Sequence, residues 1–233
     1  MNEEDFIKEL EKINIRLTEL QKEQLKKYFE LLVEWNKKIN LTRIIEKKDV
    51  YLKHFYDSLT ITRIVDLNNK YKVCDVGTGA GFPGVVLKIV FPQLEVVLLD
   101  SLNKRINFLK EVIEKLELKN ITAVHERMEV YSKNHIEEFD IITSRAVAKV
   151  NIITEISVQS LKIKGHLILM KGMCDDEIKE ADKIILCTNC KINKIERLEL
   201  PVENSKRTLI DIVKNGKTPS KYPRSIDKIK KSL

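Results

Sequence analysis

Residues 73–84, which read VCDVGTGAGFPG, join an apolar run to four glycines and a proline. Glycine adopts positive φ readily and lets a ligand approach the backbone without meeting a Cβ atom. Proline is favoured in the first turn of a helix, where its missing N–H is not needed. The stretch therefore predicts a buried strand, a tight turn and a helix. Because a merely tight turn rarely needs so many glycines, it also indicates a site for a nucleotide-like cofactor.

Short apolar runs and helical patterns alternate from residue 71 onwards, which indicates a doubly wound α/β fold with a mostly parallel, Rossmann-like sheet. Residues 191–200 and 207–213 have no long helix between them, so we expect them to close the sheet as an antiparallel pair. The other predicted strands are 72–76, 95–99, 121–125, 139–143 and 166–170, and the predicted helices are 83–90, 104–116, 150–161 and 175–186.

A helical extension precedes the sheet. Thr18 and Gln21 form a capping-box pattern, and apolar residues then recur every three or four positions from Leu25 to Ile39. A second helical stretch is expected over residues 50–65. The 233 residues, 43% of them apolar, suit one α/β domain with an extension. We therefore divide the chain into a helical extension (1–70), a cofactor-binding core (71–214) and a basic tail (215–233).

The positive charge is concentrated near the C-terminus. The chain has a formal net charge of +7, and residues 214–231 contain seven basic residues and one acid. A nucleic-acid partner accounts for such a segment, because each phosphate that is neutralised releases counterions. On charge alone, a solvated tail in a lysine-rich protein is an equally good interpretation.

Neither the cysteines nor the ends of the chain indicate secretion. Four cysteines are too sparse for a disulfide framework, so we expect reduced thiols. Cys187 and Cys190 have the spacing of half a zinc site, but no second pair completes it, and we expect no metal. The first residues are acidic and no apolar run is long enough to span a bilayer. We expect a cytoplasmic monomer without a membrane partner.

Two cofactor classes fit the glycine-rich turn. Residues 79–84 satisfy G-x-G-x-x-G, and Asp100 ends the next strand, where a dinucleotide ribose needs an acceptor, so NAD is one candidate. Asp75 lies two residues before Gly77, which with Gly79 gives the D-x-G-x-G-x-G arrangement. That arrangement favours S-adenosylmethionine, because its ammonium group attracts a nearby carboxylate and it has no pyrophosphate. We favour S-adenosylmethionine.

Three further residues fit this cofactor in strand order. Asp100 is expected to accept hydrogen bonds from the ribose hydroxyls, and Met128 and Glu129 to cover the adenine and meet its amino group. All lie where the strands end, which is where open α/β sheets bind ligands. Each also has a structural interpretation: Asp100 as a helix cap, Met128 as core and Glu129 as a solvated acid.

The chain resembles a family over nearly its whole length. The stretches that carry the resemblance are WNKKINLT (35–42), HFYDSL (54–59), the glycine-rich turn, SRA (144–146), KG (171–172) and YPR (222–224). On these motifs it resembles the bacterial 16S ribosomal RNA guanine-N7 methyltransferases, the glucose-inhibited division protein B family. The resemblance implies a class I methyltransferase fold and methyl transfer to N7 of one guanine in the small ribosomal subunit. The cofactor contacts it implies are Gly77, Phe82, Met128, Glu129 and Arg145. Met128 stands where the family usually has alanine, so the side chain in this wall of the cofactor pocket is larger.

The predicted chemistry needs few catalytic groups. Guanine N7 is an exposed lone pair, so no deprotonation precedes attack and catalysis is mostly positioning. Arg145 is the predicted catalytic residue, a donor to the guanine O6 or to a phosphate, with a structural ion pair as the alternative. His54 and Asp57 either line the substrate entrance or form a helix-stabilising pair. An NAD-dependent oxidoreductase and a non-catalytic RNA-binding module remain as alternatives.

Overall fold

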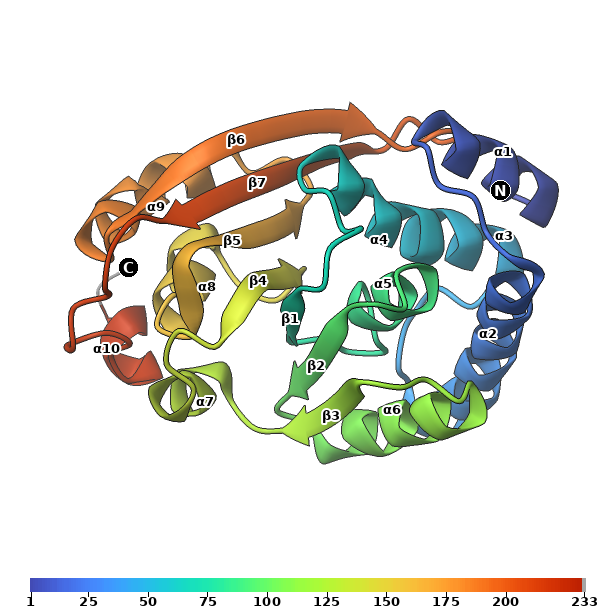
Figure 1. The fold of residues 1–233 in the computed structure, drawn as a ribbon, viewed down its shortest axis with the longest axis horizontal. Helices are drawn as coiled ribbons and strands as arrows, with labels where there is room; N and C mark the ends of the chain where they lie inside the picture. Colours follow the sequence, from blue (N-terminus) through green and yellow to red (C-terminus); the bar gives the residue numbers. More distant parts are fainter. Residues whose placement is uncertain (232–233) are drawn as a thin grey trace.

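In the described part of the chain, seven strands form one sheet in the order β3-β2-β1-β4-β5-β7-β6 (Figure 1). The computed structural model describes residues 1–231, without the side chain of Lys230. Strands β1 to β5 pair in parallel, and β7 is antiparallel to both β5 and β6, which confirms the predicted doubly wound sheet and its antiparallel pair. The strands are β1 (Lys72–Val76), β2 (Glu95–Asp100), β3 (Ile121–His125), β4 (Phe139–Arg145), β5 (Leu161–Lys171), β6 (Cys190–Glu199) and β7 (Lys206–Lys214).

Helices cover both faces of the sheet. Alternate strand residues point to opposite faces, so Val96 belongs to one core with α2, α5 and α6, and Val97 belongs to a second core with α7, α8 and α9. The helices are α1 (Glu3–Lys12), α2 (Glu19–Ile39), α3 (Lys47–Val50), the π-helix η1 (Tyr51–Tyr56), α4 (Asp57–Leu59), the 3-10 helix η2 (Thr60–Arg63), α5 (Gly84–Val90), α6 (Asn103–Lys115), α7 (Met128–Asn134), α8 (Val150–Ser157), α9 (Asp175–Cys187) and α10 (Ile226–Lys230).

Two boundaries of the predicted elements were wrong by four residues or more. The helix predicted over 150–161 ends at Ser157, and β5 begins at Leu161 rather than at 166. The first part of β5 is irregular, because Lys164 has a positive φ of 70° and the register with β4 shifts between Phe139 and Ile141. Such a start has no continuous apolar run, so the sequence pattern did not mark it as a strand. The helices α7 and α10 were not predicted.

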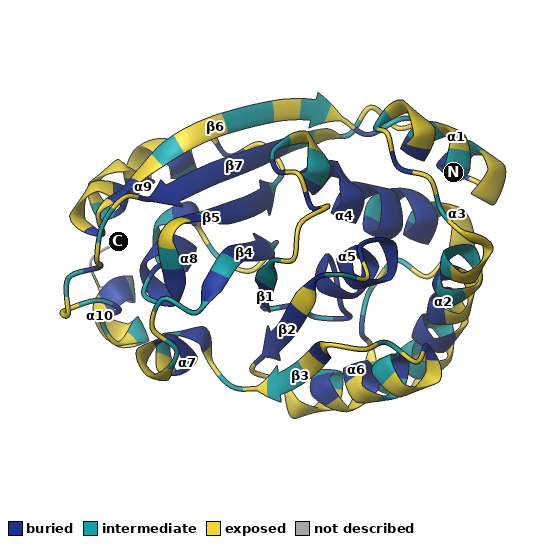
Figure 2. Cartoon of the chain, viewed as in Figure 1, coloured by how far each residue is buried: buried dark blue, intermediate teal, exposed yellow. Residues whose placement is uncertain are grey.

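The N-terminal extension packs directly on the sheet domain. The capping box of Thr18 and Gln21 is present, and Nε2 of Gln21 also donates to the carbonyl oxygens of Ile89 and Val90, each at 3.0 Å. The last carbonyl oxygens of a helix have no hydrogen-bond donor within the helix, and here Gln21 supplies one for the end of α5. In Figure 2 buried residues fill most of the central strands, β7, α4 and α5, whereas much of β6 and the outer faces of α2 and α6 are exposed. The extension and the sheet therefore share one core.

The C-terminal segment is folded against the domain. Lys214, the last residue of β7 and one of the seven basic residues counted in 214–231, is only 1% exposed, and its ammonium group donates to the carbonyl oxygens of Val158 and Leu161 at 3.0 and 2.8 Å. It is thus unavailable to a phosphate. Residues 232 and 233 of the predicted tail lie outside the described residues. Within residues 1–231, no helix combines the length and the apolar character that crossing a membrane requires.

Candidate active site

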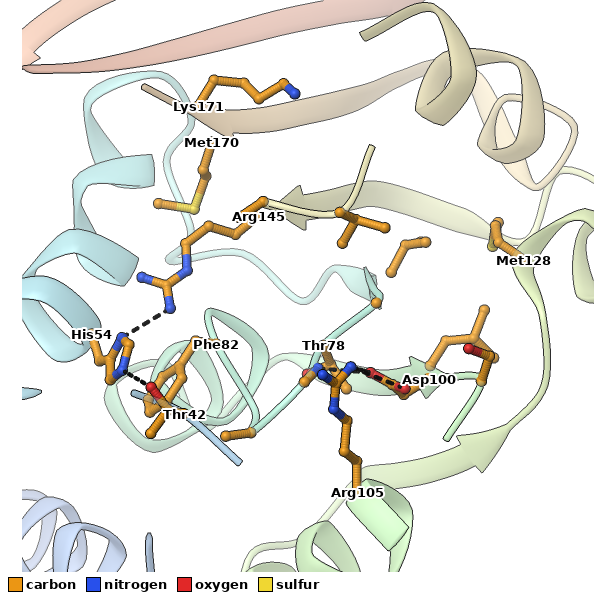
Figure 3. Close-up of a pocket in the computed structure, with 18 of the residues that line it drawn as sticks. Thr42, His54, Thr78, Phe82, Asp100, Arg105, Met128, Arg145, Met170 and Lys171 are labelled. Carbon is orange, nitrogen blue, oxygen red and sulfur yellow. Dashed lines mark hydrogen bonds and ion pairs between the residues drawn. The ribbon is translucent and has the colours of Figure 1, made fainter. Parts of the chain in front are cut away.

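A cleft of about 860 Å³ opens where β1, β2 and β4 end (Figure 3). This is the edge at which open α/β sheets bind ligands. Seven of the eight predicted site residues line the cleft, and Asp75 does not: those that do are Gly77, Gly79, Phe82, Asp100, Met128, Glu129 and Arg145.

The glycine-rich turn presents bare backbone to the cleft. Gly77 and Gly79 have φ of 66° and 62°, a region that favours glycine. A Cβ atom on Gly77 would lie 2.4 Å from Cγ2 of Val147, whereas one on Gly79 would meet nothing closer than the Gly77 carbonyl oxygen at 3.9 Å. Gly79 therefore faces open space, which suits the close approach of a ligand.

Asp75 shapes the turn from behind. It is fully buried, and its Oδ2 accepts hydrogen bonds from Oγ1 of Thr78 at 2.7 Å and from the backbone N–H of Gly84 at 2.8 Å. Burial raises the pKa of this carboxyl to about 6. The acid thus holds the two ends of the turn together. A direct contact with the cofactor's ammonium group stays a prediction, and the geometry gives Asp75 a different task.

Asp100 lines the cleft and binds the backbone before α6, although Leu102 is the residue that caps this helix; the contact of Asp100 with a ribose stays a prediction. The Oδ2 of Asp100 accepts from the backbone N–H of Gly79 at 2.9 Å and from Arg105 at 3.1 Å. Its Oδ1 accepts from the backbone N–H of Leu102 at 2.9 Å, directly before α6. Because Arg105 already occupies one oxygen, a ribose hydroxyl must compete with that arginine for the carboxylate.

Met128 and Glu129 begin α7 beyond the end of β3. Met128 is buried in the second core and still lines the cleft, so its core interpretation and its ligand-facing interpretation are compatible. Glu129 is partly buried and lies 3.9 Å from Arg127. This pair therefore places one apolar and one acidic group on the same wall, beside Asp100.

Arg145 is anchored to the N-terminal extension. Its Nη1 donates to the Lys53 carbonyl oxygen at 2.7 Å and to Oδ2 of Asp57 at 3.3 Å, and its Nη2 donates to Nδ1 of His54 at 3.0 Å (Figure 3 shows the contact with His54). The guanidinium also lies over the Phe82 ring, 5.3 Å from its centre. The structural ion pair expected as an alternative role is present. Within residues 1–231, Nε–H and one Nη2 hydrogen of Arg145 make no hydrogen bond.

His54 is a neutral imidazole stacked on Phe82. A guanidinium only donates, so Nδ1 of His54 accepts from Arg145, and Nε2 therefore carries the proton that it donates to Oγ1 of Thr42 at 3.1 Å. Burial and the charge of Arg145 lower the pKa of His54 to about 3. The rings of His54 and Phe82 are 4.3 Å apart and nearly parallel. His54 thus works as a fixed acceptor for Arg145.

The carboxylate of Asp57 accepts hydrogen bonds from two arginines. Asp57 is 4% exposed, and its Oδ2 accepts from Nε of Arg207 at 3.1 Å as well as from Arg145. The helix-stabilising pair considered for His54 and Asp57 was wrong: both side chains bind Arg145 instead of each other. Sequence reasoning missed Thr42 and Arg207. Thr42 at least ends one of the motifs, whereas nothing around Arg207 in the sequence marks it.

The cysteines do not gather in this region as a metal site. In the part of the chain that the structure describes, no group of three or more His, Cys, Asp or Glu side chains is arranged to hold a metal ion. Cys187 is exposed and Cys190 is buried, and all four cysteines are free thiols. That the protein works without a metal stays a prediction.

The strand order, the antiparallel β7 and the glycine-rich turn at the end of β1 define the class I methyltransferase fold. Solved structures share it. A SAM dependent methyltransferase from Aquifex aeolicus superposes with a TM-score of 0.54 at 20% identity, over 75% of this chain and 97% of that one. TYW2 from M. jannaschii, solved in complex with AdoMet, superposes with a TM-score of 0.53 at 15% identity, over 62% and 68%. At such identities the likeness concerns the fold alone.

Sequence relatives specify the family. The family model described as GidB, rRNA small subunit methyltransferase G, matches residues 21–210. Ribosomal RNA small subunit methyltransferase G of Staphylococcus carnosus is 44% identical over 228 residues, 96% of this chain and 95% of the relative. The Desulforamulus reducens protein of the same name is 49% identical over 211 residues, 89% and 88%. The chain belongs to the rRNA small subunit methyltransferase G family and is a methyltransferase, which sets aside the oxidoreductase and the non-catalytic module.

Proposed function

We propose that this chain transfers the methyl group of S-adenosylmethionine to N7 of one guanine in the 16S RNA of the small ribosomal subunit. The observation that supports this best is the single cleft shared by two kinds of residue. The glycine-rich turn and Asp100 lie on its cofactor side, and Arg145 lies across from them with two free donors. The protein acts in the cytoplasm as a monomer.

The cleft fits the cofactor. Its volume lies within the range of about 300–1,000 Å³ typical of small-molecule sites. Gly79 has no side chain to occupy the open space in front of it. The carboxylates of Asp100 and Glu129 line the cleft and can accept hydrogen bonds from hydroxyl and amino groups. When bound, S-adenosylmethionine supplies an electrophilic methyl group. The chain's own part is to bind the cofactor, and the glycine-rich turn, Asp100 and Glu129 are the residues that would hold it.

The guanine side needs donors rather than a base. Guanine N7 is a free lone pair, so nothing has to remove a proton before it reacts. The neutral His54 keeps its proton on Nε2, and Asp57 is held by two arginines, so neither is placed as a general base. The free Nε–H and Nη2–H of Arg145 match the O6 acceptor of guanine, and orientation then supplies most of the catalysis.

The proposal is tested by methyl transfer to small subunits from cells that lack the enzyme. We expect tritium from labelled S-adenosylmethionine to enter 16S RNA, and borohydride followed by aniline to cleave the RNA at a single guanine. Label at any other atom overturns the proposed position. Calorimetric titration with S-adenosylhomocysteine and with NAD provides the control: the first binds and the second does not. Comparing naked RNA, mature subunits and assembly intermediates identifies the form that the enzyme accepts.

A further inference from the structure

The motif Tyr222-Pro223-Arg224 is tied to the domain by an ion pair. Nε and Nη2 of Arg224 donate to Oε1 and Oε2 of Glu155 at 2.8 and 2.6 Å, and the backbone N–H of Arg224 donates to Oε1 at 3.0 Å. Glu155 lies in α8 and is 1% exposed. Both oxygens of a buried carboxylate are thus satisfied by one residue of the C-terminal segment, a geometry that is strong and directional. Arg224 is therefore not one of the charges available to RNA.

This ion pair sets the position of α10. Ser225 precedes the helix, Ile226 begins it, and Ile229 is buried in the second core. In Figure 1 the C-terminal segment, drawn in red, turns back toward α8 and α7. Ile226 also lines the cleft, although it lies 81 positions beyond Arg145 in the chain.

Three apolar side chains that belong to the second core or pack against it also line the cleft. They come from three separate elements: Met128 from α7, Ile156 from α8 and Ile226 from α10. Ile156 directly follows Glu155, so the ion pair that holds Arg224 also sets the distance between Ile156 and the tail. Flat aromatic ligands are held by apolar walls of this kind, with a few polar groups at the edge, and Glu129 lies beside Met128.

We infer that the C-terminal segment completes the adenine-binding corner of the cofactor cleft, with Ile226 as a wall of that corner. Arg224 is a positioning residue: it does not touch the cofactor but holds Ile226 in place through Glu155. The inference rests on the proposed function, because it assigns the adenine of the proposed cofactor to this corner. It gives the tail a task other than binding RNA.

The test compares tail variants in the full-length protein, with S-adenosylhomocysteine as the probe in calorimetry. We expect Arg224→Gln and Ile226→Ala each to weaken binding roughly fivefold to tenfold, because one apolar wall no longer packs against the ring. Arg224→Lys should give an intermediate affinity, because it keeps the charge but not the two-pronged geometry. The matched control is Lys228→Gln, which removes one exposed charge from the same helix and should leave the affinity unchanged.

Two readouts separate positioning from mere stabilisation. In the wild type, backbone amides of residues 222–229 should exchange more slowly once S-adenosylhomocysteine is bound, a measurement that needs no variant to fold. In the variants, KM for S-adenosylmethionine should rise while kcat and KM for RNA stay unchanged. Unchanged affinity in a folded Ile226→Ala, or unchanged exchange in the wild type, overturns the inference. A rise confined to KM for RNA also overturns it, because the corner then holds the substrate. A wild type that does not bind S-adenosylhomocysteine overturns the proposed function as well.

Discussion

Arg145 and His54 lie 91 positions apart in the chain, and Nη2 of the first donates to Nδ1 of the second at 3.0 Å. The predicted catalytic arginine comes from the sheet domain, and the acceptor that orients it comes from the N-terminal extension. The same guanidinium also donates to the Lys53 carbonyl oxygen and to Asp57 of that extension. The extension therefore belongs to the site, because without it the guanidinium at the end of β4 would have no fixed direction.

Replacing Arg145 should lower the rate of methyl transfer more than it weakens cofactor binding. Arg145→Ala is expected to reduce methyl transfer at least about tenfold, because removing a charge-assisted hydrogen bond costs about 1.5–3 kcal/mol. Arg145→Lys keeps a positive charge beside Asp57 and should fold well, but it cannot reproduce the planar fork and should not restore full activity. The measurement is tritiated methyl transfer with melting temperature as the control. Full activity in Arg145→Ala would remove this residue from the site.

The neutral state of His54 predicts a dependence of stability on pH. Its pKa is lowered from 6.5 to about 3 in the folded protein, so between those values the unfolded chain binds a proton that the folded protein does not. The contribution is fully present above pH 6.5 and is lost as pH falls toward 3, at a slope of about 1.4 kcal/mol per pH unit. Urea unfolding of wild type and His54→Gln at pH 7, 6 and 5 measures the difference. Parallel pH dependences would show that His54 protonates in the folded state.

The fold could be predicted where a strand follows a regular local pattern. The bounds of β1 agree with the predicted 72–76, because a buried parallel strand reads as a continuous apolar run. Those of β3 also agree with the predicted 121–125, although most of this edge strand is not fully buried. The start of β5 could not be predicted, because its positive φ at Lys164 and its register shift are set by pairing with β4. The local pattern of apolar residues indicates which strands are buried, whereas a positive φ or a register shift depends on the neighbouring strand.

The site could be predicted in its composition but not in its connections. The glycines and Asp100 follow from a local motif, and they do line the cleft. The hydrogen-bond partners of Asp75 could not be predicted from that motif, because only the folded turn brings Thr78 and Gly84 within reach of its carboxylate. Arg207 joins the network from a position 150 residues beyond Asp57, and no spacing rule links such distant positions.

Filling the cleft at Gly79 should abolish cofactor binding. The φ of 62° disfavours any side chain, so Gly79→Ala measures the cost of backbone strain, whereas Gly79→Arg adds a side chain in the open space. We expect no detectable binding of S-adenosylhomocysteine to Gly79→Arg by calorimetry, and weakened but measurable binding to Gly79→Ala. Gly77→Arg should also prevent binding, through displacement of Val147. Unchanged affinity in both arginine variants would refute this cleft as the cofactor site.

The part of the tail that remains free for RNA consists of exposed lysines. Lys217 and Lys221 are exposed, whereas Lys214 is buried and Arg224 is paired with the buried Glu155. Replacing Lys217 and Lys221 by glutamine should weaken RNA binding and flatten its salt dependence by roughly 0.7 to 0.9 for each phosphate that is no longer neutralised. Arg224→Gln serves as the control, since an arginine already paired with Glu155 releases no counterions from RNA. Affinities at several salt concentrations, measured by filter binding, give the two slopes. If the double variant keeps the wild-type slope, these lysines are a solvated surface and the RNA is bound elsewhere; if Arg224→Gln flattens the slope as much, the ion pair with Glu155 opens when RNA binds.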